Sequence, residues 1–128
     1  MKVRTAAALF AASILSASTA FSGSPMISSI PNQYIGPNSS TPLINFQLYD
    51  DVTDPSDLTI TFSSSNTELV PNSTDSIILG GSGANRTIRV VPLPKKTGIT
   101  TISLNATDSD GEIGQESFDV EVIKTLSN

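Results

Sequence analysis

The sequence contains no cysteine, no histidine and no tryptophan. A chain without cysteine forms no disulfide, so its stability must come from packing. Without histidine and cysteine there is no imidazole base, no thiolate nucleophile and no ordinary zinc site. The absence of tryptophan and an aromatic content of 5% also disfavour a sugar-binding surface. We therefore expect a protein that is not an enzyme and that carries no cofactor, apart from the candidate calcium ion considered below.

Apolar runs long enough to cross a membrane are also absent. Lys2 and Arg4 precede an apolar run over residues 6–15, and small residues follow at 18–20. This is the three-part pattern of a secretory signal peptide, and the run is shorter than the roughly 20 residues that span a bilayer. We predict a cleaved signal peptide over residues 1–20 and no membrane span in the mature chain. The expected location is extracellular or at the cell surface, with the periplasm as an alternative.

Positive charge is scarce, because seven Lys and Arg residues stand against twelve Asp and Glu residues. The net charge is −5 at pH 7, and loss of Lys2 and Arg4 with the signal peptide would change it from −5 to −7. Such a surface repels phosphate backbones, so we expect no nucleic-acid partner. We predict a mature N-terminal segment at 21–25, one domain at 26–124 and a C-terminal tail at 125–128.

Most of the remaining sequence alternates between apolar and polar residues, which is the pattern of strands with one buried face. The clearest inward-facing positions are Ile44, Phe46, Leu48, Leu58, Ile60, Phe62, Ile88, Val90, Ile102, Leu104, Ala106, Phe118, Val120 and Val122. Strands are predicted at residues 26–30, 43–49, 58–63, 69–70, 77–79, 88–90, 99–107 and 115–123. Seven to eight short strands at this spacing predict an all-β, immunoglobulin-like antiparallel β-sandwich.

Several stretches resemble bacterial immunoglobulin-like or cadherin-like repeat domains of secreted and surface proteins. They are "ISSIPNQ" (27–33), "SSSNTELVPN" (63–72), "LGGSGANRTIRVVP" (79–92), "TGITTISLNATDSDG" (97–111) and "ESFDVEV" (116–122). The resemblance spans residues 26–123 and implies a β-sandwich that serves as a spacer or adhesive module, without catalysis. That family usually carries many copies on one chain. A single copy is expected to act alone, to self-associate or to join a larger assembly.

Two glycine-containing stretches are predicted to be turns. Residues 79–92 fail both glycine patterns of phosphate sites, because Asn85 and Arg86 stand where those patterns require glycine. A strand follows instead of a helix, so these glycines are expected to join two strands. Asp110 and Gly111 lie between two alternating runs and predict a two-residue hairpin.

Acidic residues gather in the segments that follow two of the predicted strands. In an immunoglobulin-like sandwich, the B–C and F–G loops lie at the same end. If the strands at 43–49, 58–63, 99–107 and 115–123 are B, C, F and G, six carboxylates meet there. Hard oxygen ligands suit Ca²⁺, and the alternative is a hydrated acidic loop pair. The candidate calcium ligands are Asp50, Asp51, Asp54, Asp57, Asp108 and Asp110.

The leading functional hypothesis is a secreted, non-enzymatic structural or adhesive module that acts through protein–protein contacts. Self-association through an exposed sheet edge is the expected route, because the unpaired N–H and C=O groups of an edge can accept another strand. The N-terminal segment at 21–30 is the candidate strand. The alternative is a domain that binds carbohydrate or protein through the acidic loops, with calcium as a cofactor. A third hypothesis is a small secreted enzyme inhibitor.

Overall fold

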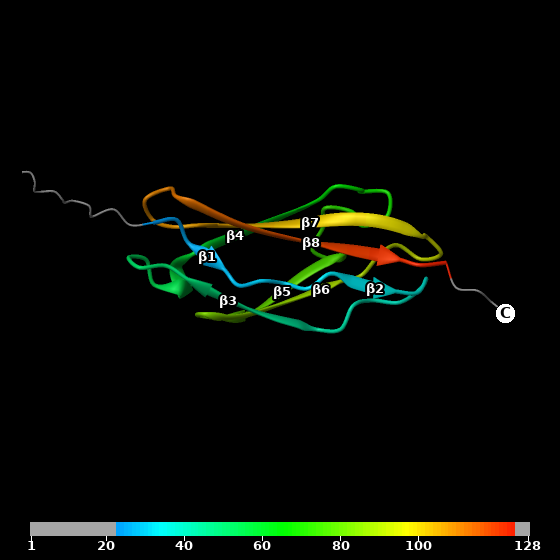
Figure 1. Cartoon of the computed structure of the whole chain (residues 1–128), viewed down its shortest axis with the longest axis horizontal. Helices are drawn as coiled ribbons and strands as arrows, with labels where there is room; N and C mark the ends of the chain where they lie inside the picture. Colours follow the sequence, from blue (N-terminus) through cyan, green and yellow to red (C-terminus); the bar gives the residue numbers. More distant parts are fainter. Residues whose placement is uncertain (1–22, 125–128) are drawn as a thin grey trace, which may run out of the picture.

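The computed structural model describes residues 23–124. The predicted signal peptide and C-terminal tail lie outside these residues, so those boundaries stay predictions. Within the described part, eight strands form two four-stranded sheets that pack face to face (Figure 1). No helix in residues 23–124 is long and apolar enough to cross a membrane. The two-sheet, all-β sandwich confirms the fold class expected from the alternating sequence.

The order of the strands is that of an immunoglobulin-like sandwich. The first sheet has the order β1 (Met26–Ile27), β3 (Ile44–Tyr49), β6 (Asn85–Val90) and β5 (Ile77–Ser82). The second has the order β2 (Gln33–Ile35), β8 (Ile113–Val122), β7 (Gly98–Thr107) and β4 (Thr59–Ser64). β3, β4, β7 and β8 thus occupy the B, C, F and G positions. All pairs are antiparallel except β2 with β8, which is parallel.

The core lies between the two sheets and is built from the inward-facing positions predicted from the sequence. Along β3 and β7 every second residue is buried and the residues between them are more exposed. Ile60 and Phe62 are half-buried and pack against this core from β4, which is an edge strand. The fully enclosed apolar side chains of the core include Ile77, Ile88, Val90, Ile102, Leu104, Ala106 and Val120.

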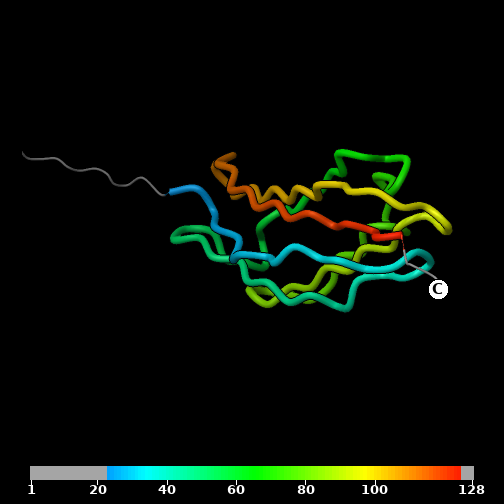
Figure 2. The backbone as a smooth tube through the Cα atoms, turned by 45° about the vertical axis from the view of Figure 1, so that its right-hand side comes forward, coloured from blue at the N-terminus to red at the C-terminus, as the bar shows by residue number. Residues whose placement is uncertain are grey.

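The first predicted strand, at residues 26–30, is wrong in its extent. β1 ends after two residues, and the chain crosses to the second sheet to form β2, which the sequence did not predict. Both views show this segment running along the side of the sandwich between β3 and β8 (Figure 2). The backbone N–H of Ile30 donates to Glu116 Oε2 at 2.9 Å. A side chain at Gly114 would overlap the carbonyl oxygen of Pro25, so these contacts with β8 direct the crossing.

The predicted strand at Leu69 and Val70 is also wrong, because these residues form a turn. Their backbone N–H groups donate to the carbonyl oxygen of Asn66 at 3.1 and 2.9 Å. Both side chains are buried and belong to the core. Two adjacent apolar residues do not distinguish a strand from a turn whose side chains pack inward.

The two predicted turns have different outcomes. Ser82 pairs with Asn85 across a two-residue turn at Gly83 and Ala84, so the prediction for residues 79–92 is confirmed. Gly83 has a φ of 60°, the sign that a type II′ turn requires at its first central position. The second hairpin has a longer loop than predicted. Gly111 N–H donates to Asp108 O at 3.1 Å and has a φ of 86°, as in three-residue hairpin loops.

Candidate functional site

The two acidic loops lie at the same end of the sandwich, as the sequence predicted. One follows β3 and contains residues 50–58, and the other, residues 108–112, joins β7 to β8 (Figure 1). They are in direct contact, because the hydroxyl oxygens of Thr53 and Ser109 are 3.0 Å apart. The N–H of Ser109 also donates to the Thr53 hydroxyl at 3.2 Å. We call these two loops together the acidic pole.

Asp50 caps the first loop from inside. Its side chain is 8% exposed, and its Oδ2 accepts from the N–H groups of Val52 at 3.2 Å and Thr53 at 2.7 Å. Its other oxygen, Oδ1, is buried and has no hydrogen-bond partner. The carboxylate therefore holds the loop with one oxygen and leaves the other available.

Asp108 caps the second loop in the same way. It is 6% exposed, and its Oδ1 accepts from the N–H groups of Asp110 and Glu112, each at 2.9 Å. Its Oδ2 is buried and unpartnered. Each loop of the acidic pole thus encloses one carboxylate with one unpartnered oxygen.

The other four predicted ligands are exposed. Asp54 precedes the short 3₁₀ helix η2 (Pro55–Asp57), and its Oδ1 accepts from the hydroxyl of Ser56 at 2.7 Å and from its N–H at 2.9 Å. These bonds, the hydroxyl first, lower the pKa of Asp54 below its ordinary value of 3.8. Asp51, Asp57 and Asp110 are also exposed.

The six predicted ligands do not form one cluster. Within residues 23–124, no group of three or more acidic side chains is close enough together to hold a metal ion. A calcium site at the acidic pole would therefore draw on at most two of these carboxylates, with its other ligands supplied by neutral oxygens. Calcium binding itself stays a prediction.

Arg86 contributes to the acidic pole in a way that the sequence did not predict. It lies opposite the buried Phe46 and is half-buried. Its Nε donates to Gly83 O at 2.7 Å and its Nη2 donates to Pro55 O at 3.0 Å. The guanidinium group therefore joins the β5–β6 hairpin to the first acidic loop.

A second candidate site is an apolar groove along β1 and β3. It has a volume of about 480 Å³, and its lining includes Met26, Leu48, Tyr49 and Ala84. Met26 and Tyr49 are cross-strand partners, with 63% and 61% of their surface exposed. The alternating pattern did place Tyr49 outward, but only the pairing of β1 with β3 brings Met26 beside it.

The sheet that carries this groove also differs in charge from the other sheet. None of its four strands contains an acidic residue. In the second sheet, β8 carries Glu116, Asp119 and Glu121. The negative charge is therefore concentrated on β8 and the loops, which leaves one sheet of a strongly acidic protein free of carboxylates.

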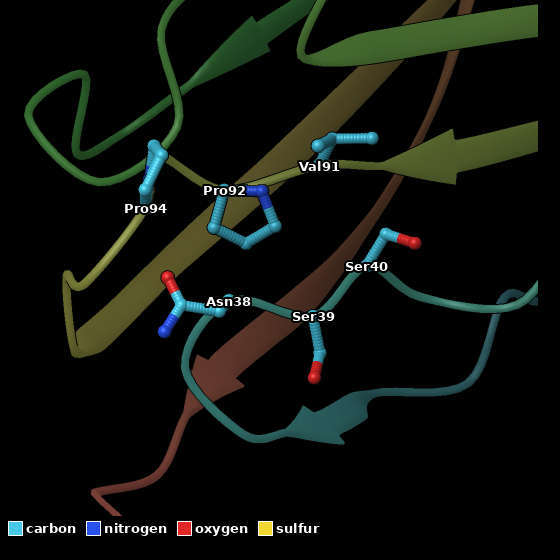
Figure 3. Close-up of a pocket in the computed structure, with 6 residues that line it drawn as sticks. All are labelled: Asn38, Ser39, Ser40, Val91, Pro92 and Pro94. Carbon is cyan, nitrogen blue, oxygen red and sulfur yellow. The ribbon is translucent and has the colours of Figure 1, made fainter.

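A third candidate site is a hollow of about 330 Å³ at the loops before β3 and after β6 (Figure 3). It is lined by Asn38, Ser39, Ser40, Val91, Pro92 and Pro94. The Asn38 side chain accepts from the N–H of Lys95 at 2.9 Å, so it has a structural role. No titratable side chain lines this hollow, and its residues supply neither a general base nor an activated nucleophile.

Comparisons with known proteins identify the fold. No protein-family model matches the sequence, and no curated protein matches it. Among solved structures, the tandem Ig repeats of Dlar align with a TM-score of 0.59 at 11% identity, over 82% of this chain and 51% of that one. The chain thus spans about half the length of that structure. The titin M3 domain aligns with a TM-score of 0.51 at 17% identity, over 77% of this chain and 97% of that domain.

The RIG-5 IG1 homodimer aligns with a TM-score of 0.52 at 11% identity, over 79% of this chain and 99% of that one. These likenesses support an immunoglobulin-like β-sandwich. At such low identity they establish the fold alone, because one fold hosts many unrelated functions.

Proposed function

We propose that this protein is a secreted, non-enzymatic immunoglobulin-like module that acts through protein–protein contacts, with a second copy of itself as the first partner. The observation that carries the proposal is the apolar groove along β1 and β3. Large apolar side chains grouped at the surface of a soluble domain commonly mark an interaction site. Met26 and Tyr49 form such a group on an edge strand and its neighbour.

The charge distribution supports association through the same sheet. Two mature copies, each with a net charge of −7 after the loss of Lys2 and Arg4, repel one another. The repulsion is weakest where the approaching surfaces carry no carboxylates, and the strands of the first sheet carry none. A contact centred on Met26 and Tyr49 would bury apolar surface and keep the acidic strand β8 of each copy in water.

Two further observations agree with this proposal. The signal-peptide pattern of residues 1–20 supports a secreted protein. The RIG-5 IG1 domain, which has the same fold, is recorded as a homodimer. The sandwich of this chain is suited to a similar role, because its strand β1 lies at a sheet edge and pairs through only two residues.

Light scattering coupled to size exclusion tests the proposal over a wide range of concentration. Tyr49→Ser removes the larger apolar side chain of the groove and should shift a dimer to monomer. Tyr34→Ser is the matched control, because Tyr34 is 64% exposed but lies on the second sheet, and it should leave the dimer intact. A wild-type protein that stays monomeric throughout, or equal effects of the two substitutions, would contradict self-association through this groove.

A further inference from the structure

Asp50 and Asp108 occupy equivalent places at the end of the core. In β3 the inward-facing residues are Ile44, Phe46 and Leu48, and Asp50 is the next position in that alternation. In β7 they are Ile102, Leu104 and Ala106, and Asp108 is the next position there. β3 and β7 belong to the two facing sheets. Both carboxylates therefore extend into the space between the sheets, where the core ends at the acidic pole.

The contacts around them bring the two sites close together. Asp50 holds the N–H of Thr53, and the Thr53 hydroxyl contacts both the hydroxyl and the N–H of Ser109, the residue after Asp108. The loop capped by Asp50 and the loop capped by Asp108 are thus in direct contact through Thr53 and Ser109. Facing sheets are stacked about 10 Å apart, a gap that two inward-pointing aspartates and one ion can fill.

The unpartnered oxygens of Asp50 and Asp108 need a hydrogen-bond donor or a cation. Asp50 Oδ1 and Asp108 Oδ2 are buried without a hydrogen bond, and a buried carboxylate oxygen without a partner costs free energy. The other oxygen of each group accepts two backbone N–H bonds, which are strongest when the carboxylate is ionised. The guanidinium group of Arg86 lies at this end, and it donates to the carbonyl oxygens of Gly83 and Pro55 rather than to either aspartate.

We propose that Asp50 and Asp108 jointly bind one Ca²⁺ ion between the two sheets. Two ionised carboxylates match the charge of a divalent cation. Ca²⁺ accepts six to eight oxygen ligands in irregular arrangements, so loop carbonyls, hydroxyls and water can complete the shell, whereas Mg²⁺ requires a near-ideal octahedron. The bound ion links the loop after β3 to the β7–β8 loop and stabilises the acidic pole. This site is independent of the proposed self-association.

Calcium titration of the purified full chain, after treatment with a chelator, tests the site. Isothermal titration calorimetry should show one saturable site, over calcium concentrations up to about 10 mM, above the range typical of weak extracellular sites. The thermal unfolding midpoint should rise by about 5 °C or more at saturation. NaCl at equal ionic strength should not reproduce this rise, and MgCl₂ should produce a smaller one.

Substitutions locate the ion. Asp50→Asn and Asp108→Asn keep one oxygen to accept the loop N–H bonds and replace the other by an amide nitrogen, which cannot bind a cation. Either one should abolish the calcium-dependent rise. Asp51→Asn and Asp110→Asn remove the same charge at exposed positions of the same two loops and should retain it.

Two results would overturn the proposal. One is the absence of saturable calcium binding by the wild-type protein, which does not depend on whether any variant folds. The other is an equal calcium response in the buried and exposed variants, because that would indicate general screening of an acidic surface. Neither result bears on the dimer, which Tyr49→Ser tests separately.

Discussion

At the residue scale, single polar side chains hold the loops of this protein in place. Asp50, Asp54 and Asp108 each accept hydrogen bonds from backbone N–H groups within four residues of themselves. Such local bonds satisfy donors that a turn would otherwise leave free. The acidic residues at this end are therefore structural as well as charged.

Asp54 gives a prediction for pH. Its pKa is lowered by the hydroxyl of Ser56 and then by the Ser56 N–H. A lowered folded-state pKa means that the cap stabilises the protein above pH 3.8 and that this contribution is lost as the pH falls through the folded-state pKa. NMR titration of the Asp54 carboxyl carbon should give a pKa below 3.8. Ser56→Ala should move it upward toward 3.8, and an unchanged value would contradict the assigned cause.

Gly114 gives a prediction for packing. A Cβ at this position would overlap the carbonyl of Pro25, and backbone atoms cannot move aside as a flexible side chain can. We expect Gly114→Ala to lower the free energy of unfolding by about 1–3 kcal/mol, the usual cost of overpacking. Urea unfolding measures the loss. Gly23→Ala is the control, since a Cβ there meets no atom within 4 Å, and an equally destabilised control would refute the steric explanation.

At the scale of elements, the acidic pole joins the two sheets through loops. The hydroxyl groups of Thr53 and Ser109 are in contact, although the two residues are 56 positions apart in the sequence. Thr53 is 6% exposed, so its hydroxyl depends on this partner. The contact connects the loop after a strand of the first sheet to a hairpin of the second.

We expect the two hydroxyls to be coupled in stability. A double-mutant cycle with Thr53→Val and Ser109→Ala should give an interaction free energy of about 0.5–1.5 kcal/mol, the net value of one hydrogen bond. Denaturant unfolding of the four proteins supplies the measurement. Thr61→Val with Ser109→Ala is the control pair, because Thr61 is exposed within β4 and should show no coupling. Additive effects in the first pair would contradict the contact.

At the scale of the whole molecule, the core carries the stability. The chain has no cysteine, and globular domains are stable by only about 5–15 kcal/mol. The buried apolar residues of β7, which are Ile102, Leu104 and Ala106, belong to the core between the sheets. Truncation of one such side chain therefore removes a large share of the free energy of unfolding.

Leu104→Ala should lower the free energy of unfolding by about 2–5 kcal/mol, through lost burial and the cavity that remains. Ile99→Ala is the matched control on the same strand, because Ile99 is 52% exposed, and it should change stability by less than about 0.5 kcal/mol. Thermal or urea unfolding of the two variants measures the difference. Equal losses in the two variants would contradict a core confined to the inward positions.

The sequence by itself determined the fold class, the inward-facing positions and the turn at Gly83, because period-two alternation and glycine chemistry act over short distances. It also placed the two acidic loops at one end, through the order of the strands. Only the tertiary structure decided that the N-terminal strand divides between the sheets, since contacts with β8 direct that crossing. It likewise decided that Asp50 and Asp108 each keep one buried oxygen without a partner, and which apolar side chain lies beside Tyr49. Those outcomes depend on packing between segments far apart in the chain, which no local pattern encodes.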